Sequence, residues 1–297
     1  MTAHPLGRLG VWTWLDALPA PQAAAFARRI ESLGYTALWL PEAVGRDPFA
    51  TIAFLGAQTG RLAFATGIAN LYARDAMTTN ALRRTVGELT GGRFVLGLGV
   101  SHAHLVTGVR GHAYQKPLAA MRAYLDAMEK SLYRAVGADV EVPVVLAALR
   151  PKMLALAAER AQGAHPYLVP PEHTARAREI LGKGPILAPE PKVLLCTDPA
   201  KARAVARAAI RIYTGLPNYQ NNLKWLGFGD TDFADGGSDR LVDALVAWGD
   251  ETAIRARIQA HFDAGADHVC IQPLHPEGQP VPHDEVLGLL APARAGK

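Results

Sequence analysis

The sequence predicts a (β/α)8 barrel, in which eight parallel strands alternate with helices around a closed sheet. Three observations predict this fold. The chain has 297 residues, of which 49% are hydrophobic and 20% charged, and this suits one large core of barrel size. One helix–glycine–strand unit occurs three times along the chain. Eight apolar, strand-like runs are separated by helical patterns. An open, doubly wound sheet produces the same local pattern and is the alternative.

The repeated unit occurs near the start, in the middle and near the end of the chain. Its copies are Ala27 to Leu40, Leu156 to Val169 and Ile258 to Ile271. Each begins as an amphipathic helix, and a glycine marks the expected helix end because glycine readily adopts the left-handed conformation that stops a helix. The three glycines are Gly34, Gly163 and Gly265. A small turn and an apolar strand follow in each copy.

The remaining elements follow from apolar runs and helical periodicity. The predicted strands are Leu9–Trp14, Ala37–Leu40, Leu62–Thr66, Phe94–Leu98, Val142–Ala147, His165–Val169, Lys192–Cys196 and His268–Gln272. The predicted helices are Gln22–Leu33, Pro48–Gln58, Thr78–Leu89, Leu118–Leu132, Pro151–Ala161 and Pro171–Leu181.

One segment is too long for a single crossover. Between Cys196 and His268 there is room for about three helices. We expect one domain over residues 1–297, with a helical insertion at approximately 213–250 between the seventh and eighth strands. The insertion is rich in aromatic residues, asparagine and glycine, which is typical of a lid or a subunit contact. A helical hairpin packed on the side of the barrel is the alternative.

The composition of the chain indicates which classes of partner to expect and in which cellular compartment the protein lies. The 31 basic and 27 acidic residues are scattered, and no Lys/Arg cluster interleaves with aromatics, so we expect no nucleic-acid partner. The N-terminus lacks an apolar run of signal-peptide type, and no stretch approaches a membrane span. Cys196 and Cys270 lie in apolar runs and are interpreted as reduced core residues. These observations predict a cytoplasmic protein with no membrane partner.

The central stretch is Arg61 to Arg74. It begins as a buried strand, the pattern breaks at Gly67-Ile68, and the chain leaves through Asn70 and Tyr72. A glycine inside a strand marks a bulge or a close approach of backbone to a ligand, whereas at a strand end it can be an ordinary loop signal. The break lies at the carboxyl end of the strand, where barrels place their sites.

Other residues at the predicted mouth carry chemistry. They include an aromatic pair (Trp12 and Trp14) after the first strand, a carboxylate (Glu42) after the second and an imidazole (His102) after the fourth. Pro151 fits the first position of a helix, and Arg150 and Lys152 flank it. The free N–H groups of a helix start and two cations form a plausible phosphate site, and two solvated cations at an ordinary helix start are the alternative.

Two other interpretations of the fourth strand fail on its sequence. In the segment FVLGLGVSH, Gly97 and Gly99 are the first two glycines of a dinucleotide fingerprint, but His102 stands at the third position. We therefore predict no Rossmann site. His102 and His104 lack a carboxylate or cysteine partner nearby in sequence, so we predict no metal site.

Longer motifs resemble the luciferase-like monooxygenase superfamily, and within it the branch that uses the deazaflavin coenzyme F420. The resemblance covers nearly the whole chain. It is carried by GRLGVWTWL, LGYTALWLPEAVGRDPF, ATGIANLYARDAMT, GRFVLGLGVSHAHLVTGVRGH, AERAQGAHPYLVPPEHTARA, LPNYQNNLKWLGF, GGSDRLVDALVAWGD and DAGADHVCIQPL. These motifs indicate the fold and the cofactor class, but they do not identify the substrate.

The resemblance implies a luciferase-like barrel with the cofactor ring in its carboxyl-end mouth. It implies that a bulge at Gly67-Ile68, often with a non-prolyl cis peptide, presses on the back of the ring, and that the tail phosphate lies near residues 150–153. It also implies a homodimer. The cofactor-binding residues that it implies are Thr66, Gly67, Ile68, Asn70, Gly99, Val100, Ser101, Ala148, Arg150, Lys152 and Met153.

The chain departs from its relatives at three positions. Relatives commonly have glycine where this chain has Arg150, which adds a phosphate contact or crowds the site. Sugar-phosphate dehydrogenases of the superfamily carry an acid at the position of His102, and an acid–histidine pair where this chain has Glu42 and Ala43. The sequence therefore does not support oxidation of a sugar phosphate.

The leading hypothesis is a hydride-transferring oxidoreductase that uses F420 and a small organic substrate. His102 is the predicted proton donor or acceptor, because an unperturbed imidazole titrates near neutrality. Glu42 is predicted to contact the ring or to tune His102. The predicted substrate pocket consists of Trp12, Trp14, Tyr72 and, from the insertion, Tyr219. The alternatives are an FMN-dependent monooxygenase supplied by a partner reductase, and a flavin- or deazaflavin-binding protein without catalysis.

Overall fold

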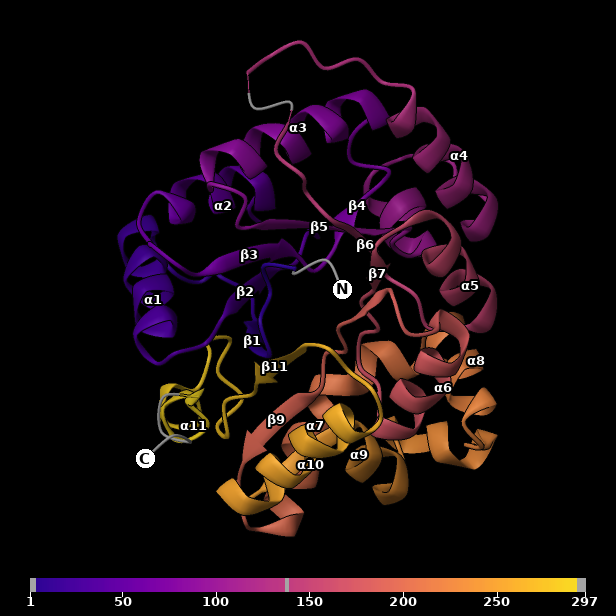
Figure 1. Cartoon of the computed structure of the whole chain (residues 1–297). Coiled ribbons are helices and arrows are strands. Elements are labelled where there is room, and N and C mark those ends of the chain that lie inside the picture. The colour runs from indigo at the N-terminus through magenta and orange to yellow at the C-terminus, as the bar shows by residue number, and fades with distance from the viewer. Residues whose placement is uncertain (1–3, 137–138, 293–297) are drawn as a thin grey trace.

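Eight strands close into a parallel barrel with helices outside it, as the sequence predicts (Figure 1). The structure is a computed structural model and describes residues 4–136 and 139–292. The staves are β1 (Leu9–Trp12), β2 (Ala37–Leu40), β3 (Ala63–Thr66), β5 (Phe94–Gly99), β6 (Val144–Leu146), β7 (Gly163–Ala164), β8 (Ile186–Leu187) continued by β9 (Lys192–Leu195), and β11 (Val269–Pro273). Every pairing between them is parallel.

The segment between β8 and β9 closes the ring, because it bonds to neighbours on both sides. The backbone N–H of Glu190 donates to Pro166, beyond β7, at 2.9 Å. On the other side, the N–H of Cys270 in β11 donates to Pro189 at 3.1 Å. β11 in turn pairs with β1. The open-sheet alternative is therefore wrong.

Three short strands were not predicted, and one was misplaced. β4 (Ala69–Asn70) resumes the third stave after the break and pairs with β5. β8 has two residues, and β10 (Val246–Gly249) pairs with the outer side of β9 inside the expected helical insertion. The sixth predicted strand starts too late: the paired residues are Gly163–Ala164, and Tyr167 forms only an isolated bridge with Glu190.

Gly163 explains the misplaced strand. Gly34 and Gly265 have positive φ (86° and 99°) and stop their helices as expected, but Gly163 does not have a positive φ. It lies within β7 instead, where a Cβ would be 2.2 Å from the carbonyl oxygen of Ile186. Glycine is needed here for close approach of two strands rather than for a helix end.

The helices of the barrel layer lie close to their predicted positions. They are α1 (Ala20–Ser32), α2 (Pro48–Gly56), α3 (Ala76–Leu89), α4 (Pro117–Glu129), α5 (Pro151–Arg160), α6 (Pro171–Leu181) and α10 (Glu251–Asp263), with α11 (Asp284–Leu289) near the C-terminus. Proline occupies the first turn of α1, α2 and α4 to α8. It is tolerated there because its missing N–H would have no partner in the helix.

The insertion between β9 and β11 contains α7 (Pro199–Thr214), α8 (Pro217–Trp225), a 3-10 segment (Asp230–Gly236), α9 (Asp239–Leu245) and β10. With α10, four α-helices lie between Cys196 and His268, one more than the length predicts. They pack through a separate apolar cluster that includes Ile210, Leu223 and Leu241. Figure 1 shows this part beside β9 and α6, on one side of the barrel.

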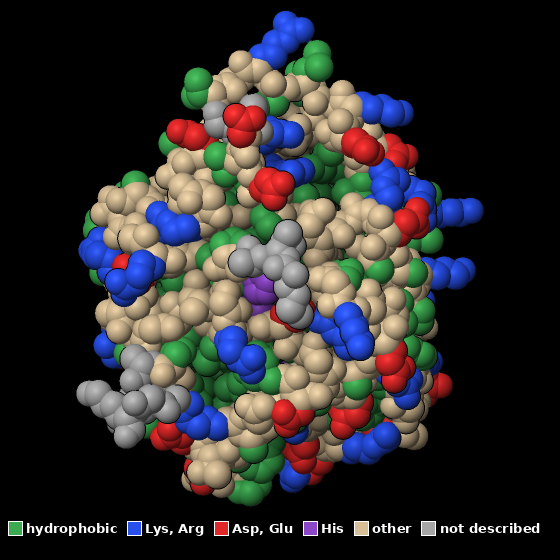
Figure 2. All heavy atoms as spheres, viewed as in Figure 1, with side chains coloured by type: hydrophobic (Ala, Val, Ile, Leu, Met, Phe, Trp, Pro, Cys, Tyr) green, Lys and Arg blue, Asp and Glu red, His purple; other side chains and the backbone are tan. Residues whose placement is uncertain are grey.

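The barrel interior combines large aromatic with small side chains. Trp12 and Trp39 pack there against Ala37, Ala63 and Ala65, and the apolar layer between sheet and helices is a separate cluster. On the face seen in Figure 2, basic and acidic side chains are interspersed among apolar ones. No helix in the described residues is long and apolar enough to cross a membrane.

Candidate functional site

The break in the third stave contains a cis peptide bond between Gly67 and Ile68, as predicted. The indole Nε1 of Trp12 donates to the Gly67 carbonyl oxygen at 2.8 Å. On the other side, the hydroxyl of Thr66 donates to the carbonyl of Gly97 (2.8 Å) and accepts from its N–H (2.9 Å). These three hydrogen bonds hold the bulge between β1 and β5. Ile68 is half-buried beyond it.

The two glycines of β5 are required by this bulge. A Cβ on Gly97 would lie 2.0 Å from the carbonyl oxygen of Thr66, and one on Gly99 would lie 2.4 Å from Cδ1 of Ile68. Gly67 is equally confined, because its Cβ would lie 2.5 Å from Nε1 of Trp12. The segment that resembled an incomplete dinucleotide fingerprint is therefore a cradle for the strand beside it.

His102 follows β5 and is half-buried at the mouth. Ser101 before it has a φ of 55°, which turns the chain out of the strand. The imidazole stacks on His104 (ring centroids 5.8 Å apart) and lies 5.8 Å from the ring of Tyr219 in α8. Burial, together with His104, lowers the pKa of His102 to about 4. The ring is then neutral at pH 7 and has an acceptor nitrogen.

Glu42 braces the loop that leaves the third stave. Its Oε2 accepts from the N–H of Asn70 (2.8 Å) and from Arg74 (2.9 Å), and its Oε1 lies 2.7 Å from Arg74. Arg74 also pairs with Asp47. Both oxygens of the carboxylate are occupied, and within the described residues no contact joins Glu42 to His102. The loop is thus braced by the Asn70 backbone and Arg74, while contact of Glu42 with a cofactor stays a prediction.

An aromatic wall crosses the mouth. It consists of Trp14, Trp12, Tyr167, Tyr213 and Tyr219, with successive ring centroids 5.5, 5.0, 5.3 and 5.1 Å apart. Its last ring contacts His102. The structure therefore brings three of the four predicted pocket residues onto one wall, together with two tyrosines that were not predicted.

Tyr72, the fourth predicted pocket residue, packs elsewhere. Its ring lies 5.7 Å from that of Tyr114, and its hydroxyl accepts from the N–H of Gln115 at 2.9 Å. Tyr114 in turn donates to the carbonyl of Ser101 at 3.3 Å. Tyr72 thus supports the loop that carries His102.

A buried ion pair lies behind the wall and was not predicted. The ammonium of Lys192, 1% exposed, donates to the hydroxyl of Tyr167 (2.8 Å), Oε1 of Glu190 (3.2 Å) and Oε1 of Gln272 (2.5 Å). Burial raises the pKa of Glu190 to about 7, and the Lys192 ammonium opposes this rise. The other oxygen of Glu190 accepts from the N–H of Leu168, whose φ is 57°. All three donors of Lys192 are occupied, so the pair fixes the loop that holds Tyr167.

The start of α5 retains the features of the predicted phosphate site. Arg150 is the N-cap residue, Pro151 follows, and neither a side-chain cap nor an acidic residue occupies the first turn. Arg150 and Lys152 are exposed and form no ion pair within the described residues. Ala148 is buried and Met153 half-buried. The turn is held by His173, whose Nε2 lies 2.6 Å from the carbonyl oxygen of Leu149.

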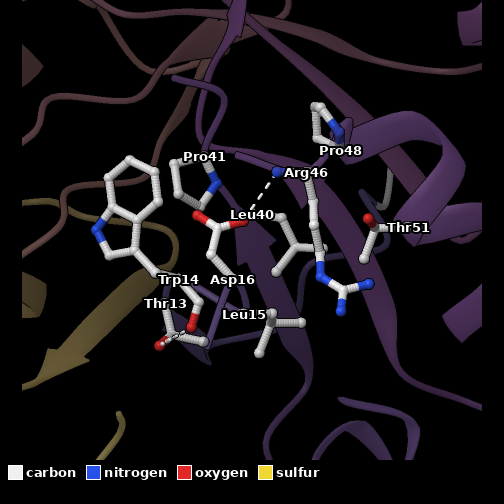
Figure 3. A pocket seen from close by; sticks show the side chains of 9 residues that line it. All are labelled: Thr13, Trp14, Leu15, Asp16, Leu40, Pro41, Arg46, Pro48 and Thr51. Carbon is white, nitrogen blue, oxygen red and sulfur yellow. Dashed lines mark hydrogen bonds between the residues drawn. The ribbon is translucent and has the colours of Figure 1, made fainter. Parts of the chain in front are cut away.

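A small hollow lies at the rim, at the ends of β1 and β2 (Figure 3). Thr13, Trp14 and Pro41 line it, and the carboxylate of Asp16 accepts from the N–H of Arg46 at 2.9 Å. The Arg46 guanidinium donates to Leu18 at 2.6 Å. His102 does not line this hollow, so its residues form the outer edge of the mouth rather than its centre.

The relatives that are similar to this chain in sequence include two proteins. One is a protein of Mycobacterium tuberculosis assigned by name to the coenzyme F420-dependent oxidoreductases; it is 29% identical over 209 residues, which are 60% of this chain and 59% of the relative. The chain thus spans less than two thirds of that protein. The other is the 5,10-methylenetetrahydromethanopterin reductase of Methanolobus tindarius, 26% identical over 84% of this chain and 90% of the reductase.

Solved structures share the fold at low identity. An F420-dependent secondary alcohol dehydrogenase, solved with an F420-acetone adduct, is 14% identical over 96% of both chains, with a TM-score of 0.72. The oxygenating component of 3,6-diketocamphane monooxygenase from Pseudomonas putida, solved with FMN, is 16% identical over 98% of this chain and 99% of its own, also with a TM-score of 0.72. The family model for luciferase-like monooxygenases matches residues 7–268. The chain therefore belongs to the luciferase-like monooxygenase family.

Proposed function

We propose that the protein is a coenzyme F420-dependent oxidoreductase that transfers hydride between the deazaflavin and a small organic substrate. The observation that carries the proposal is the bulge at residues 66–68, which packs against Gly97 and Gly99 of β5, the strand that leads to the neutral imidazole of His102. The Mycobacterium relative described above supports the cofactor class, because it is named for F420.

The residues present fit a planar cofactor with an anionic tail. Gly97 and Gly99 leave room for the bulge, so that Ile68 can form a firm backstop for a ring. Arg150 and Lys152 at the start of α5 can bind a phosphate together with the free N–H groups of the first turn. When bound, the deazaflavin supplies a two-electron carrier that accepts or donates hydride at C5.

The residues of the chain have three tasks in this proposal. His102, neutral at pH 7, accepts the proton that a substrate hydroxyl loses, and returns it in the opposite direction. The aromatic wall orients an apolar substrate and excludes water. Glu42 and Arg74 hold the loop after the bulge, so we assign Glu42 a positioning role.

The second candidate is an FMN-dependent monooxygenase, which the FMN-bound structural neighbour favours. Titration of the protein with oxidised F420 and with FMN, followed by fluorescence, separates the two. We expect F420 to bind and FMN to bind more weakly. Micromolar affinity for FMN with none for F420 would reverse the choice.

Turnover distinguishes an enzyme from a binding protein without catalysis. A screen of alcohols, ketones and enones with bound F420, monitored by the deazaflavin absorbance, is expected to find a substrate that changes the redox state of the cofactor. We also propose a homodimer, which light scattering tests.

A further inference from the structure

Among the residues that the structure describes, the buried amide of Asn222 in α8 has no hydrogen-bond partner. Asn222 is fully buried, and within the described residues neither its Oδ1 nor its Nδ2 forms a hydrogen bond. Buried polar groups are nearly always paired, and an unpaired donor or acceptor destabilises the folded state. Leucine has a similar size and would avoid this cost. Within the described residues, the amide therefore has no protein partner that offsets the cost of its burial.

Asn222 lies between two contacts of α8 with the mouth. Tyr219, three residues earlier, contacts the ring of His102 beyond β5. Trp225, three residues later, lies 5.8 Å from the ring of His173, whose Nε2 meets the carbonyl of Leu149 beyond β6. Residues three apart lie on the same side of a helix. The Asn222 amide is therefore on the side of α8 that faces the carboxyl ends of β5 and β6.

The chemistry of a carboxamide restricts its partner. Oδ1 accepts and Nδ2 donates, so both are satisfied together by a group that has an N–H next to a carbonyl. An anion such as phosphate would satisfy the donor and leave Oδ1 without a partner. The orphaned pair therefore favours an amide, lactam or imide edge over an anionic group.

We propose that Asn222 is a ligand-binding residue that pairs with an imide edge of the bound cofactor. This inference rests on the proposed function, because the pyrimidinedione ring of deazaflavins and flavins has an N3–H between two carbonyls. Asn222 is covered in this structure, so pairing requires α8 to shift as the ligand enters. The insertion is then a lid over the mouth, with Tyr219 and Asn222 on its inner side.

The test replaces Asn222 by leucine and uses the exposed neighbour Asn221 as a matched control. Without ligand, Asn222→Leu is expected to raise the melting temperature by about 2–4 °C, because an unpaired amide is removed. The same variant is expected to weaken F420 binding about 10- to 100-fold, since the imide edge is left unpaired. Asn221→Leu should change neither quantity appreciably.

A ligand lacking the imide hydrogen tests the pairing directly. The probes are 5-deazariboflavin and its N3-methyl derivative, titrated by fluorescence. Wild type is expected to lose about tenfold in affinity on methylation, whereas Asn222→Leu should bind both probes equally. Equal discrimination by the two proteins, or wild-type F420 affinity in Asn222→Leu, would overturn the inference.

Two further outcomes remain decisive. If Asn222→Leu does not fold, Asn222→Ala removes the amide without added bulk, and the same measurements apply. If wild type binds neither F420 nor FMN, the proposed function fails, and the cofactor pairing of Asn222 fails with it. Binding by wild type with no effect of either variant refutes only the role of Asn222.

Discussion

Replacement of Gly67 by valine tests the construction of the bulge. A Cβ at this position would lie 2.5 Å from Nε1 and 2.8 Å from Cδ1 of Trp12, whose indole is 2% exposed. The backbone and the indole must therefore separate. Overpacking of this kind costs about 1–3 kcal/mol, and loss of the hydrogen bond from Trp12 to the Gly67 carbonyl costs about 1 kcal/mol. The sum, about 2–4 kcal/mol, lowers the melting temperature by roughly 4–15 °C.

The assay combines thermal unfolding with F420 titration. Gly67→Val is expected to remain folded at 25 °C and to bind F420 at least tenfold more weakly, because Ile68 and Trp12 are both displaced. Gly67→Ala should show a smaller effect in both measurements. Gly184→Val is the matched control, since a Cβ there meets no atom within 4 Å and its φ is not positive. Wild-type melting temperature and affinity in Gly67→Val would refute the proposed role of the bulge.

Three other perturbations address the mouth and the barrel interior. His102→Ala should lower turnover roughly 10²–10⁴-fold with little change in F420 affinity. Wild-type turnover should decline only as pH falls toward 4, where the imidazole base is protonated. A decline centred near pH 6.5 would contradict the lowered pKa of His102. Lys192→Met should destabilise the protein by about 3–5 kcal/mol in urea unfolding, because it leaves the Glu190 carboxylate buried without its cation, and Glu190→Gln in the same chain should restore part of this loss. Burial lowers the pKa of four further histidines to about 3–4, so between pH 6.5 and 4 the unfolded chain binds more protons than the folded chain. The free energy of unfolding therefore falls as pH falls, by up to about 1.4 kcal/mol per pH unit for each histidine. A melting temperature that stays constant from pH 7 to 5 would contradict this expectation. The four histidines are His165, His173, His261 and His268.

Elements with strong local signals were predictable from the sequence. The helices have amphipathic patterns and proline or aspartate starts, and the longer strands are apolar runs of four or more residues. β7 and β8 have two paired residues each, which is too short for any period to register. No glycine, proline or other turn-forming residue separates β10 from α9, so the sequence of β10 looks like a continuation of the helix.

The parts of the candidate site that come from the end of a single strand were predictable from the sequence. The bulge at residues 66–68 and His102 are each signalled by a short stretch of sequence. The Lys192 network was missed because its members come from distant positions: Tyr167 is 25 residues away and Gln272 is 80 residues away. A glutamate and a lysine two residues apart in an apolar run, as in PEPKVLL, are the signal that could have indicated a buried pair.

The hydrogen bonds of the polar groups at the mouth divide them into two kinds. Glu42 has both oxygens occupied and Lys192 has all three donors occupied, so each is fully used in holding a loop. The Asn222 amide has no partner, and the ring nitrogens of His102 form no hydrogen bond within the described residues. A buried polar group without a partner destabilises the folded state, and a ligand that supplies the partner removes that cost. On this division we propose positioning roles for Glu42 and Lys192 and ligand or substrate contact for Asn222 and His102, although sequence patterns alone gave Glu42 and His102 the same rank.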